Sequence, residues 1–247
     1  MIRIEDYEEL KVRIVNWLKD YYWKYDIKAF VVGVSGGIDS AVVSTLCAET
    51  GFPTYVLTMP LHSKKGNTEL SDAHAKTLSK KYSNVRVVNI DLSNTYESLL
   101  FDIDQDFVNN KLANANTKSR LRMVTLYQVA GSVGGIVVGT GNKVEDYGVG
   151  FYTKYGDGGV DIAPIADLYK SEVWELGEYL DVDQRIVDAK PTDGLWDDGR
   201  NDEDQIGATY VELEEAMENK TGVALNILEE YNKKNKHKME PIPTFKL

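Results

Sequence analysis

The sequence is poor in the residues that hold small secreted or metal-rich folds together. Cys47 is the only cysteine among 247 residues, which excludes an internal disulfide and a cysteine-based zinc or iron–sulfur site. A single thiol fits a reducing compartment. The N-terminus MIRIEDYEEL lacks the charged-then-apolar pattern of a secretion signal. The sequence therefore predicts a cytoplasmic protein.

Long apolar runs and an excess of positive charge are also missing. No apolar stretch approaches the roughly 20 residues that cross a bilayer, so no membrane partner is expected. The formal net charge is −11, and such an acidic chain repels the phosphate backbone of nucleic acids. Hydrophobic residues make up 43% of the chain, which is enough for one sizeable core. We expect a single domain over residues 1–247.

Short apolar segments rich in β-branched residues alternate with longer amphipathic segments. The strands are predicted at residues 28–34, 54–58, 85–90 and 135–140, and the helices between them at 39–50, 67–81, 94–110 and 116–131. This alternation predicts an α/β fold, a doubly wound parallel sheet with helices on both faces and right-handed crossovers. Ligands in such folds bind beyond the carboxyl ends of the strands.

The two ends of the chain are predicted to be helical additions to this sheet. Residues 1–27 hold a helix at 5–24, and the stretch from 206 to 247 forms a helical C-terminal part with a basic tail. After the fourth strand, the sequence predicts a glycine-rich irregular stretch at 141–161, a helix at 168–180 and an acidic loop, WDDGRNDEDQ, at 196–205. The helices of the C-terminal part are predicted at 206–218 and 225–236.

A glycine-rich loop, SGGIDS, follows the first strand directly at residues 35–40 but contains no lysine. Its glycines allow a tight turn, and the N–H groups at the start of the next helix face an anion. A carboxylate at Asp39 would repel phosphate unless a divalent cation lay between them, and Mg²⁺ bound by carboxylates and phosphate oxygens is the usual solution. The alternative is a bare turn whose helix is capped by Asp39. The complete string favours the Mg²⁺–phosphate site.

The string SGGxDS resembles the pyrophosphate loop of the N-type ATP pyrophosphatases. These enzymes cleave ATP between its α and β phosphates, form an adenylate, and let a nucleophile displace AMP. The resemblance implies an adenine nucleotide alpha hydrolase-like fold. The residues implied to contact ATP are Gly33, Val34, Ser35, Gly36, Gly37, Ile38, Asp39 and Ser40.

Four later blocks narrow the resemblance to NAD synthetase, in order and at its spacing. They are NTKSRLRMVTLY (116–127), GTGNKVEDYGVGFYTKYGDGGVDIAPIADLYKSEV (139–173), KPTDGLWDDGRNDEDQIG (190–207) and the HK pair at 237–238. The implied reaction converts deamido-NAD, ATP and ammonia to NAD, AMP and pyrophosphate. The family also implies a homodimer with deamido-NAD bound across the interface.

The resemblance assigns roles to individual residues. Asp39 and Glu145 would hold Mg²⁺, and Lys170 would neutralise phosphate charge. These three residues form the predicted catalytic set. Taken alone, Glu145 would be a solvated loop residue and Lys170 an exposed lysine near a helix start. Thr140 and Thr192 match the threonines of the family that contact ATP. The residues implied for deamido-NAD are Arg120, Lys154, Asp161, His237 and Lys238, with Asn116, Arg122 and Asp157 as further candidates.

Some residues depart from the pattern or have no role in it. Arg120 and Arg122 lie two apart on a helix and point in different directions, so at most one faces a given ligand atom. His62 and His74 are expected to be surface or packing residues, and Cys47 a packed, inert thiol. The family often has an acidic residue where Gln205 stands, and the neighbouring acids at 202–204 could substitute for it.

Two rival functions follow from the same loop. Another N-type ATP pyrophosphatase, such as a tRNA-modifying enzyme, should carry a basic face or catalytic cysteines, and this chain shows neither. A non-catalytic ATP-binding module would not need Asp39, Glu145 and Lys170 together. The first strand is predicted near residue 28, which leaves no room before it for a glutaminase domain, so free ammonia is the expected nitrogen donor.

Overall fold

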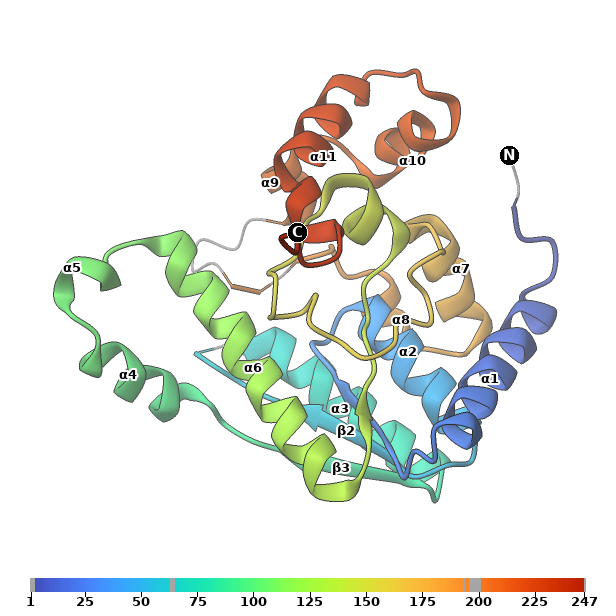
Figure 1. Ribbon diagram of the computed structural model, residues 1–247. Helices are drawn as coiled ribbons and strands as arrows, with labels where there is room; N and C mark the ends of the chain where they lie inside the picture. Colours follow the sequence, from blue (N-terminus) through green and yellow to red (C-terminus); the bar gives the residue numbers. More distant parts are fainter. Residues whose placement is uncertain (1–2, 63–64, 193, 196–200, 247) are drawn as a thin grey trace.

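A parallel sheet of four strands lies at the centre of the protein. The computed structural model (Figure 1) describes residues 3–62, 65–192, 194–195 and 201–246. The strand order is β3-β2-β1-β4, and every pairing is parallel. The strands are β1 (Phe30–Gly33), β2 (Thr54–Thr58), β3 (Val85–Asn89) and β4 (Ile136–Val137). The predicted α/β fold is confirmed.

Helices cover both faces of the sheet because successive strand residues point to opposite sides. Phe30 and Val32 pack with α1 (Tyr7–Lys24), α2 (Ile38–Glu49) and α7 (Lys170–Tyr179) in the largest core. Val31 points the other way and packs against α6 (Lys111–Val133) and α4 (Ser93–Asp102). A smaller cluster holds α3 (Lys65–Lys81) against the sheet on the α2 side. The doubly wound arrangement brings the loops after β1 and β4 to one edge.

Helix α2, which follows the SGGIDS loop, is the most enclosed helix of this core. Ten of its 12 residues are buried. Gly177 of α7 allows the two helices to touch, since a Cβ there would lie 2.5 Å from Cδ1 of Ile38. Ile38 is the first residue of α2, so α7 packs against the start of the helix that follows the loop. The loop is therefore built on a rigid base.

The C-terminal part forms its own apolar cluster above the sheet edge (Figure 1). It contains the π-helix η1 (Val144–Val149), α9 (Asp202–Ile206), α10 (Tyr210–Asn219) and α11 (Leu225–Met239). Asn232 and Asn235 of α11 donate hydrogen bonds to the backbone carbonyls of Gly148 and Val149 in η1. The basic tail predicted at the C-terminus is thus a helix that packs on the glycine-rich segment.

Several predicted boundaries were wrong because local capping residues divide the segments. The helix predicted at 94–110 is two helices, α4 and α5 (Gln105–Val108), since Ile103 is extended and Asp104 caps α5. The helix predicted at 206–218 begins at Tyr210, where Thr209 is its N-cap. Residues 202–205 of the predicted acidic loop belong to α9, and residues 196–200 lie outside the described part.

Three further elements differ from the prediction. Helix α6 begins at Lys111, five residues before the predicted start, because Asn110 caps it by accepting from the Ala113 N–H. A short helix, α8 (Gln184–Val187), was not predicted. The irregular segment predicted after β4 contains the π-helix η1, so Glu145 lies in its first turn rather than in a solvated loop.

His74 is a packing residue, as predicted, and it makes the stability of the fold depend on pH. It is 5% exposed on α3, and its Nε2 lies 2.9 Å from the Ser44 hydroxyl of α2. Burial lowers the pKa of His74 from 6.5 to about 4. The unfolded chain therefore binds a proton below pH 6.5 that the folded chain excludes, and stability falls as the pH drops from 6.5 towards 4.

We expect the unfolding free energy to be about 2 kcal/mol lower at pH 5 than at pH 8 through His74 alone. Urea titrations at both pH values would measure it, comparing the wild type with His74→Gln. The matched control is His62→Gln, because His62 is exposed and pairs with Glu97 at 3.1 Å. An unchanged pH slope in His74→Gln would contradict this assignment.

Candidate active site

The SGGIDS loop is shaped by its own polar groups. Gly36 has φ +92°, a left-handed conformation that favours glycine. The Ser40 hydroxyl donates to the Gly37 carbonyl at 3.0 Å and accepts from the Ser35 N–H at 3.2 Å. The Gly37 N–H donates to the Ser35 hydroxyl at 3.2 Å. These bonds hold the turn and leave the start of α2 at the carboxyl edge of the sheet, where an anion is favoured.

Asp39, Glu145 and Lys170, the predicted catalytic set, meet beside this loop. The ammonium Nζ of Lys170 lies 2.5 Å from Oδ2 of Asp39 and 3.1 Å from Oε1 of Glu145. The side chains of Lys170, Asp39 and Glu145 are 3%, 16% and 17% exposed. Asp39 thus binds Lys170 rather than capping its own helix, and Lys170 is buried, not an exposed lysine.

The charge of Lys170 is fixed by these neighbours. Burial alone would lower its pKa, but the carboxylates of Asp39 and Glu145 raise that pKa above its usual value. The ammonium therefore keeps its proton at neutral pH. Burial raises the pKa of the Asp39 carboxyl, and the Lys170 ammonium beside it opposes that rise. With both carboxylates ionised, the cluster carries a net charge of −1, which suits a further cation.

Asn142, which the sequence analysis missed, links two parts of this cluster. It is fully buried, and its Nδ2 donates to Oδ1 of Asp39 at 3.1 Å. Its Oδ1 accepts from the N–H groups of Val144 and Glu145, both at 3.1 Å. One side chain thus orients the Asp39 carboxylate and holds the first turn of η1, which carries Glu145.

Tyr210, also missed, completes the cluster from α10. Its hydroxyl donates to Oε1 of Glu145 at 2.7 Å, and Nζ of Lys170 lies 4.9 Å from the centre of its ring. Burial and the Glu145 carboxylate raise the pKa of Tyr210 far above its usual range, so the hydroxyl stays a donor. The ring face also favours a neighbouring cation.

The carboxylate pair has the chemistry of a Mg²⁺ site. Asp39 and Glu145 supply hard oxygen ligands that are already aimed at one cation, the Lys170 ammonium. Within the described ranges, no group of three or more His, Cys, Asp or Glu side chains converges on a point. Mg²⁺ commonly takes one or two carboxylates and completes its shell with phosphate oxygens and water. The residues therefore fit a metal that arrives with a nucleotide.

The two threonines predicted to contact ATP lie in different surroundings. Thr140 is half-buried and follows β4 at the same edge as the loop. Thr192 is exposed beyond α8, and its hydroxyl accepts from the Gly194 N–H at 3.2 Å. Their contacts with ATP remain predictions.

Most of the residues predicted for deamido-NAD gather around the glycine-rich loop at 150–161. Asn116 accepts from the Thr153 hydroxyl at 2.8 Å, and the Nε of Arg120 donates to the Lys154 carbonyl at 3.2 Å. Asp157 accepts from the Ser119 hydroxyl at 2.6 Å and from the Thr153 N–H at 3.0 Å. One face of α6 therefore braces this loop.

The tail helix holds the loop from the other side. Nζ of Lys238 donates to the carbonyls of Gly150 and Tyr152, at 2.5 and 2.8 Å, and Nζ of Lys154 donates to the His237 carbonyl at 3.4 Å. The HK pair thus reaches the loop, in agreement with a tail that folds over it.

Arg122 lies apart from this loop, and Asp161, the last residue of the loop, contacts α6 and β4 instead of the tail helix. The Nε of Arg122 donates to the Met59 carbonyl beyond β2, whereas Arg120 faces Lys154, so the two arginines point to different places as predicted. Asp161 accepts from the Tyr127 hydroxyl at 3.0 Å and from the Val137 N–H of β4 at 2.7 Å. Asp161 therefore supports the short strand. The ligand roles of all these residues remain predictions.

Comparison with known proteins identifies the family. The NAD synthase family model matches residues 10–242. The NH(3)-dependent NAD(+) synthetase of Carboxydothermus hydrogenoformans is 38% identical over 239 residues, which cover 94% of this chain and 95% of the relative. That of Finegoldia magna is 34% identical and covers 97% of both chains. The chain therefore belongs to the NAD synthase family, and the resemblance seen in the sequence is confirmed.

Solved structures show the same fold. The structure of NMN synthetase from Francisella tularensis has a TM-score of 0.92 and 36% sequence identity, and covers 99% of this chain and 100% of that chain. The NH3-dependent NAD synthetase of Campylobacter jejuni has a TM-score of 0.78 at 24% identity, and covers 98% of this chain and 100% of that chain.

Proposed function

We propose that this protein is an ammonia-dependent ligase that amidates deamido-NAD to NAD and converts ATP to AMP and pyrophosphate. The observation that carries this proposal is the buried cluster of Asp39, Glu145 and Lys170 beside a lysine-free phosphate loop. Membership of the NAD synthase family, whose model matches residues 10–242, supports it. A module that only bound ATP would have no need for this cluster.

In the proposed adenylation step, different residues of the site bind the pyrophosphate, neutralise its charge and hold the metal. The N–H groups at the start of α2 and the hydroxyls of Ser35 and Ser40 would bind the departing pyrophosphate. Lys170 would neutralise the negative charge that develops on the phosphates. Asp39 and Glu145 would hold Mg²⁺, which would neutralise charge on phosphate oxygens. The nicotinate carboxylate attacks the α-phosphorus, and ammonia then displaces AMP from the acyl-adenylate.

One assay tests the proposal. Purified protein is incubated with deamido-NAD, ATP, Mg²⁺ and ammonium, and NAD and AMP are followed by chromatography. We expect equal amounts of both products, formed only with ammonium. Pyrophosphate without NAD would reject ammonia as the nitrogen donor. Bound ATP with neither product would reject the ligase and leave a binding module or another acceptor.

A second substrate has support from one comparison. The Francisella tularensis protein is named an NMN synthetase, and it covers 99% of this chain at a TM-score of 0.92. We therefore propose nicotinic acid mononucleotide as the alternative acid. The reacting carboxyl is the same in both molecules, so the cluster serves either one. Competition of the two acids in one reaction gives the ratio of their kcat/KM values, and a ratio favouring the mononucleotide would reassign the substrate.

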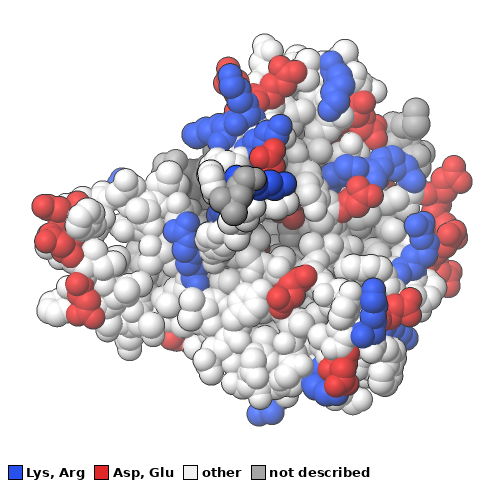
Figure 2. Space-filling view, in the orientation of Figure 1, with Lys and Arg blue, Asp and Glu red and all other residues white. Residues whose placement is uncertain are grey.

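We also propose a homodimer. Phe101 and Phe107 are 84% and 72% exposed on the α4–α5 arm, which projects from the body in Figure 1. Leu112 and Val124 are exposed along α6, and Figure 2 shows few charges over this face. Such apolar surface is typical of a protein interface. Light scattering should give about 55 kDa, twice the 27.7 kDa of one chain, and a monomer at micromolar concentration would contradict the dimer.

We keep the cytoplasm as the proposed location. Cys47 is a free, buried thiol, which is compatible with a reducing compartment. Among the helices in the described residues, none is long and apolar enough to cross a bilayer. Fractionation of cells followed by detection of the native protein would test the location, and recovery outside the cytoplasmic fraction would reject it.

A further inference from the structure

Tyr210 is the one aromatic side chain that places a hydroxyl on the carboxylates of this cluster among the described residues. It is the first residue of α10, fully buried, and its hydroxyl lies 2.7 Å from Oε1 of Glu145. The same oxygen accepts from Nζ of Lys170 at 3.1 Å. Both donors therefore bind one of the two carboxylate oxygens of Glu145.

The ring of Tyr210 is fixed before any ligand binds. Trp174 of α7 packs against it edge to face, with ring centres 6.0 Å apart at 82°. The Tyr210 N–H donates to the Glu203 carboxylate at 3.0 Å, and Thr209 caps the helix. Because ring and backbone are already held, the hydroxyl is presented to Glu145 at little cost in conformational entropy.

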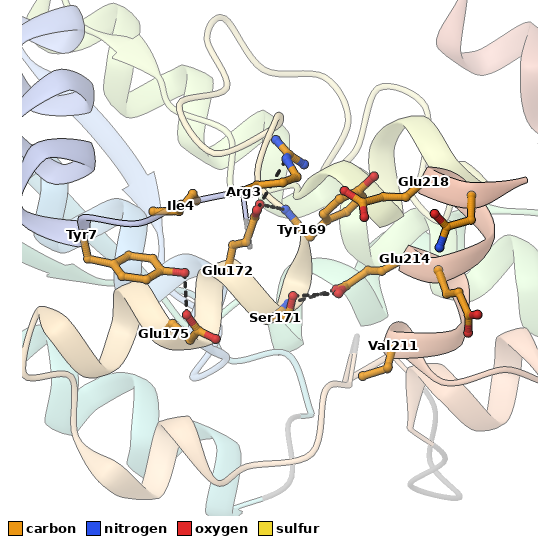
Figure 3. Close-up of a pocket in the computed structure, with 12 residues that line it drawn as sticks. Arg3, Ile4, Tyr7, Tyr169, Ser171, Glu172, Glu175, Val211, Glu214 and Glu218 are labelled. Atoms are coloured by element: carbon orange, nitrogen blue, oxygen red, sulfur yellow. Dashed lines mark hydrogen bonds and ion pairs between the residues drawn. The ribbon is translucent and has the colours of Figure 1, made fainter. Parts of the chain in front are cut away.

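A second residue of α10 holds the backbone next to Lys170. Glu214 lies one turn after Tyr210, on the same side of the helix. It accepts from the N–H and the hydroxyl of Ser171, at 2.9 and 2.6 Å, as Figure 3 shows. Ser171 follows Lys170 directly, so one face of α10 fixes both the carboxylate of Glu145 and the first turn of α7.

An acidic cavity lies beside the contact between Glu214 and Ser171, and several of the carboxylates that line it also bind groups near α7. It measures about 380 Å³ and lies between α7, α10 and the N-terminal segment (Figure 3). Glu172 accepts from the Tyr169 N–H and Glu175 from the Tyr7 hydroxyl, both at 2.7 Å. Together with Glu214, which binds Ser171, the carboxylates of Glu172 and Glu175 therefore hold α7 in place.

We propose that Tyr210 is a positioning residue that turns Glu145 so that Oε2 faces the cation of the nucleotide complex. Two donors hold Oε1, and none of the described residues donates a hydrogen bond to Oε2. Without the hydroxyl, Lys170 alone holds Glu145, and the carboxylate can rotate to offer both oxygens to the ammonium. Tyr210 thereby keeps one oxygen of Glu145 available. This inference rests on the proposed function of Asp39 and Glu145 as metal ligands.

The test is Tyr210→Phe, which removes the hydroxyl and keeps the ring in the core. Mn²⁺ is titrated by calorimetry into protein saturated with a non-hydrolysable ATP analogue. We expect the Kd for Mn²⁺ to rise ~10- to 100-fold, as is typical when a partner of a metal ligand is removed. The Mg²⁺ concentration for half-maximal rate should rise by a similar factor, and kcat should recover when Mg²⁺ saturates.

The matched control is Tyr82→Phe. Tyr82 directly follows α3, and its hydroxyl donates at 2.5 Å to a carboxylate oxygen of Glu49 at the end of α2, away from the cluster. Both variants should lower Tm by roughly 2–4 °C for the lost hydrogen bond, but only Tyr210→Phe should change Mn²⁺ affinity.

Three other results would overturn the inference in distinguishable ways. Equal Mn²⁺ affinity in wild type and Tyr210→Phe would show that Tyr210 does not position Glu145. A loss of kcat that persists at saturating Mg²⁺ would show that the hydroxyl acts on another step. If the wild type bound no Mn²⁺ with the analogue present, the metal-ligand assignment of Asp39 and Glu145 would fail first.

Discussion

Replacement of Asp39 by asparagine is expected to lower AMP formation on the order of 10²–10³-fold while the protein stays folded. Asparagine has nearly the same shape and removes only the charge. The cluster then holds Glu145 and Lys170 as a neutral pair at 3.1 Å, so no buried charge is left without a counter-charge. On the proposed mechanism, Asp39→Asn removes a ligand of Mg²⁺ and would weaken the metal site that neutralises the departing pyrophosphate.

AMP formation is measured by chromatography under saturating substrates, and Tm by circular dichroism. The control is Asp167→Asn, because Asp167 is 86% exposed and pairs with Lys143 outside the cluster. That variant should keep both rate and Tm. Near-normal pyrophosphate release by Asp39→Asn would contradict the assignment of Asp39 as a metal ligand.

Replacement of Lys170 by methionine is expected to damage both activity and stability. Methionine matches the length of the apolar part of the side chain but leaves the carboxylates of Asp39 and Glu145 facing each other, largely buried. Breaking a buried ion pair by removing one partner costs about 3–5 kcal/mol, and AMP formation should fall by at least the factor expected for Asp39→Asn.

Urea unfolding measures the first effect and chromatography the second. The double variant Lys170→Met/Asp39→Asn should regain part of the lost stability, because only one carboxylate then lacks a partner. Lys143→Met is the control, since Lys143 pairs at 2.8 Å with an exposed carboxylate and should cost about 1 kcal/mol or less. A Lys170→Met variant as stable as the wild type would mean that the carboxylates gain protons or water instead.

The pattern of residues predicted the sheet and the place of Asp39 at its edge, whereas the resemblance to NAD synthetase supplied the roles of Glu145 and Lys170. Buried strands leave runs of β-branched residues, and the glycine loop after β1 marks one edge of the sheet. Asp39 lies in that loop, Glu145 follows β4, and Lys170 starts a helix beyond it. In the structure these three residues meet beside the carboxyl ends of the parallel strands.

The uncharged members could not be predicted, because their roles come from contacts between distant segments. Asn142 binds Asp39 across 103 residues, and Tyr210 binds Glu145 across 65. A tyrosine at the start of a helix is usually a packing residue, and nothing near it in the sequence points to Glu145. The missed boundaries at Asp104 and Thr209 are different, because these capping residues mark them in the sequence itself.

The bond between Lys170 and Asp39 has a consequence for the chain as it is made. The two residues are 131 positions apart, so a ribosome releases Asp39 long before its counter-ion. Until Lys170 emerges, the Asp39 carboxylate has no buried counter-ion, so it is more stable in water than buried. Tyr210, whose hydroxyl donates to the Glu145 carboxylate, is synthesised later still. The charged cluster can therefore be completed only after the chain has been synthesised through Tyr210.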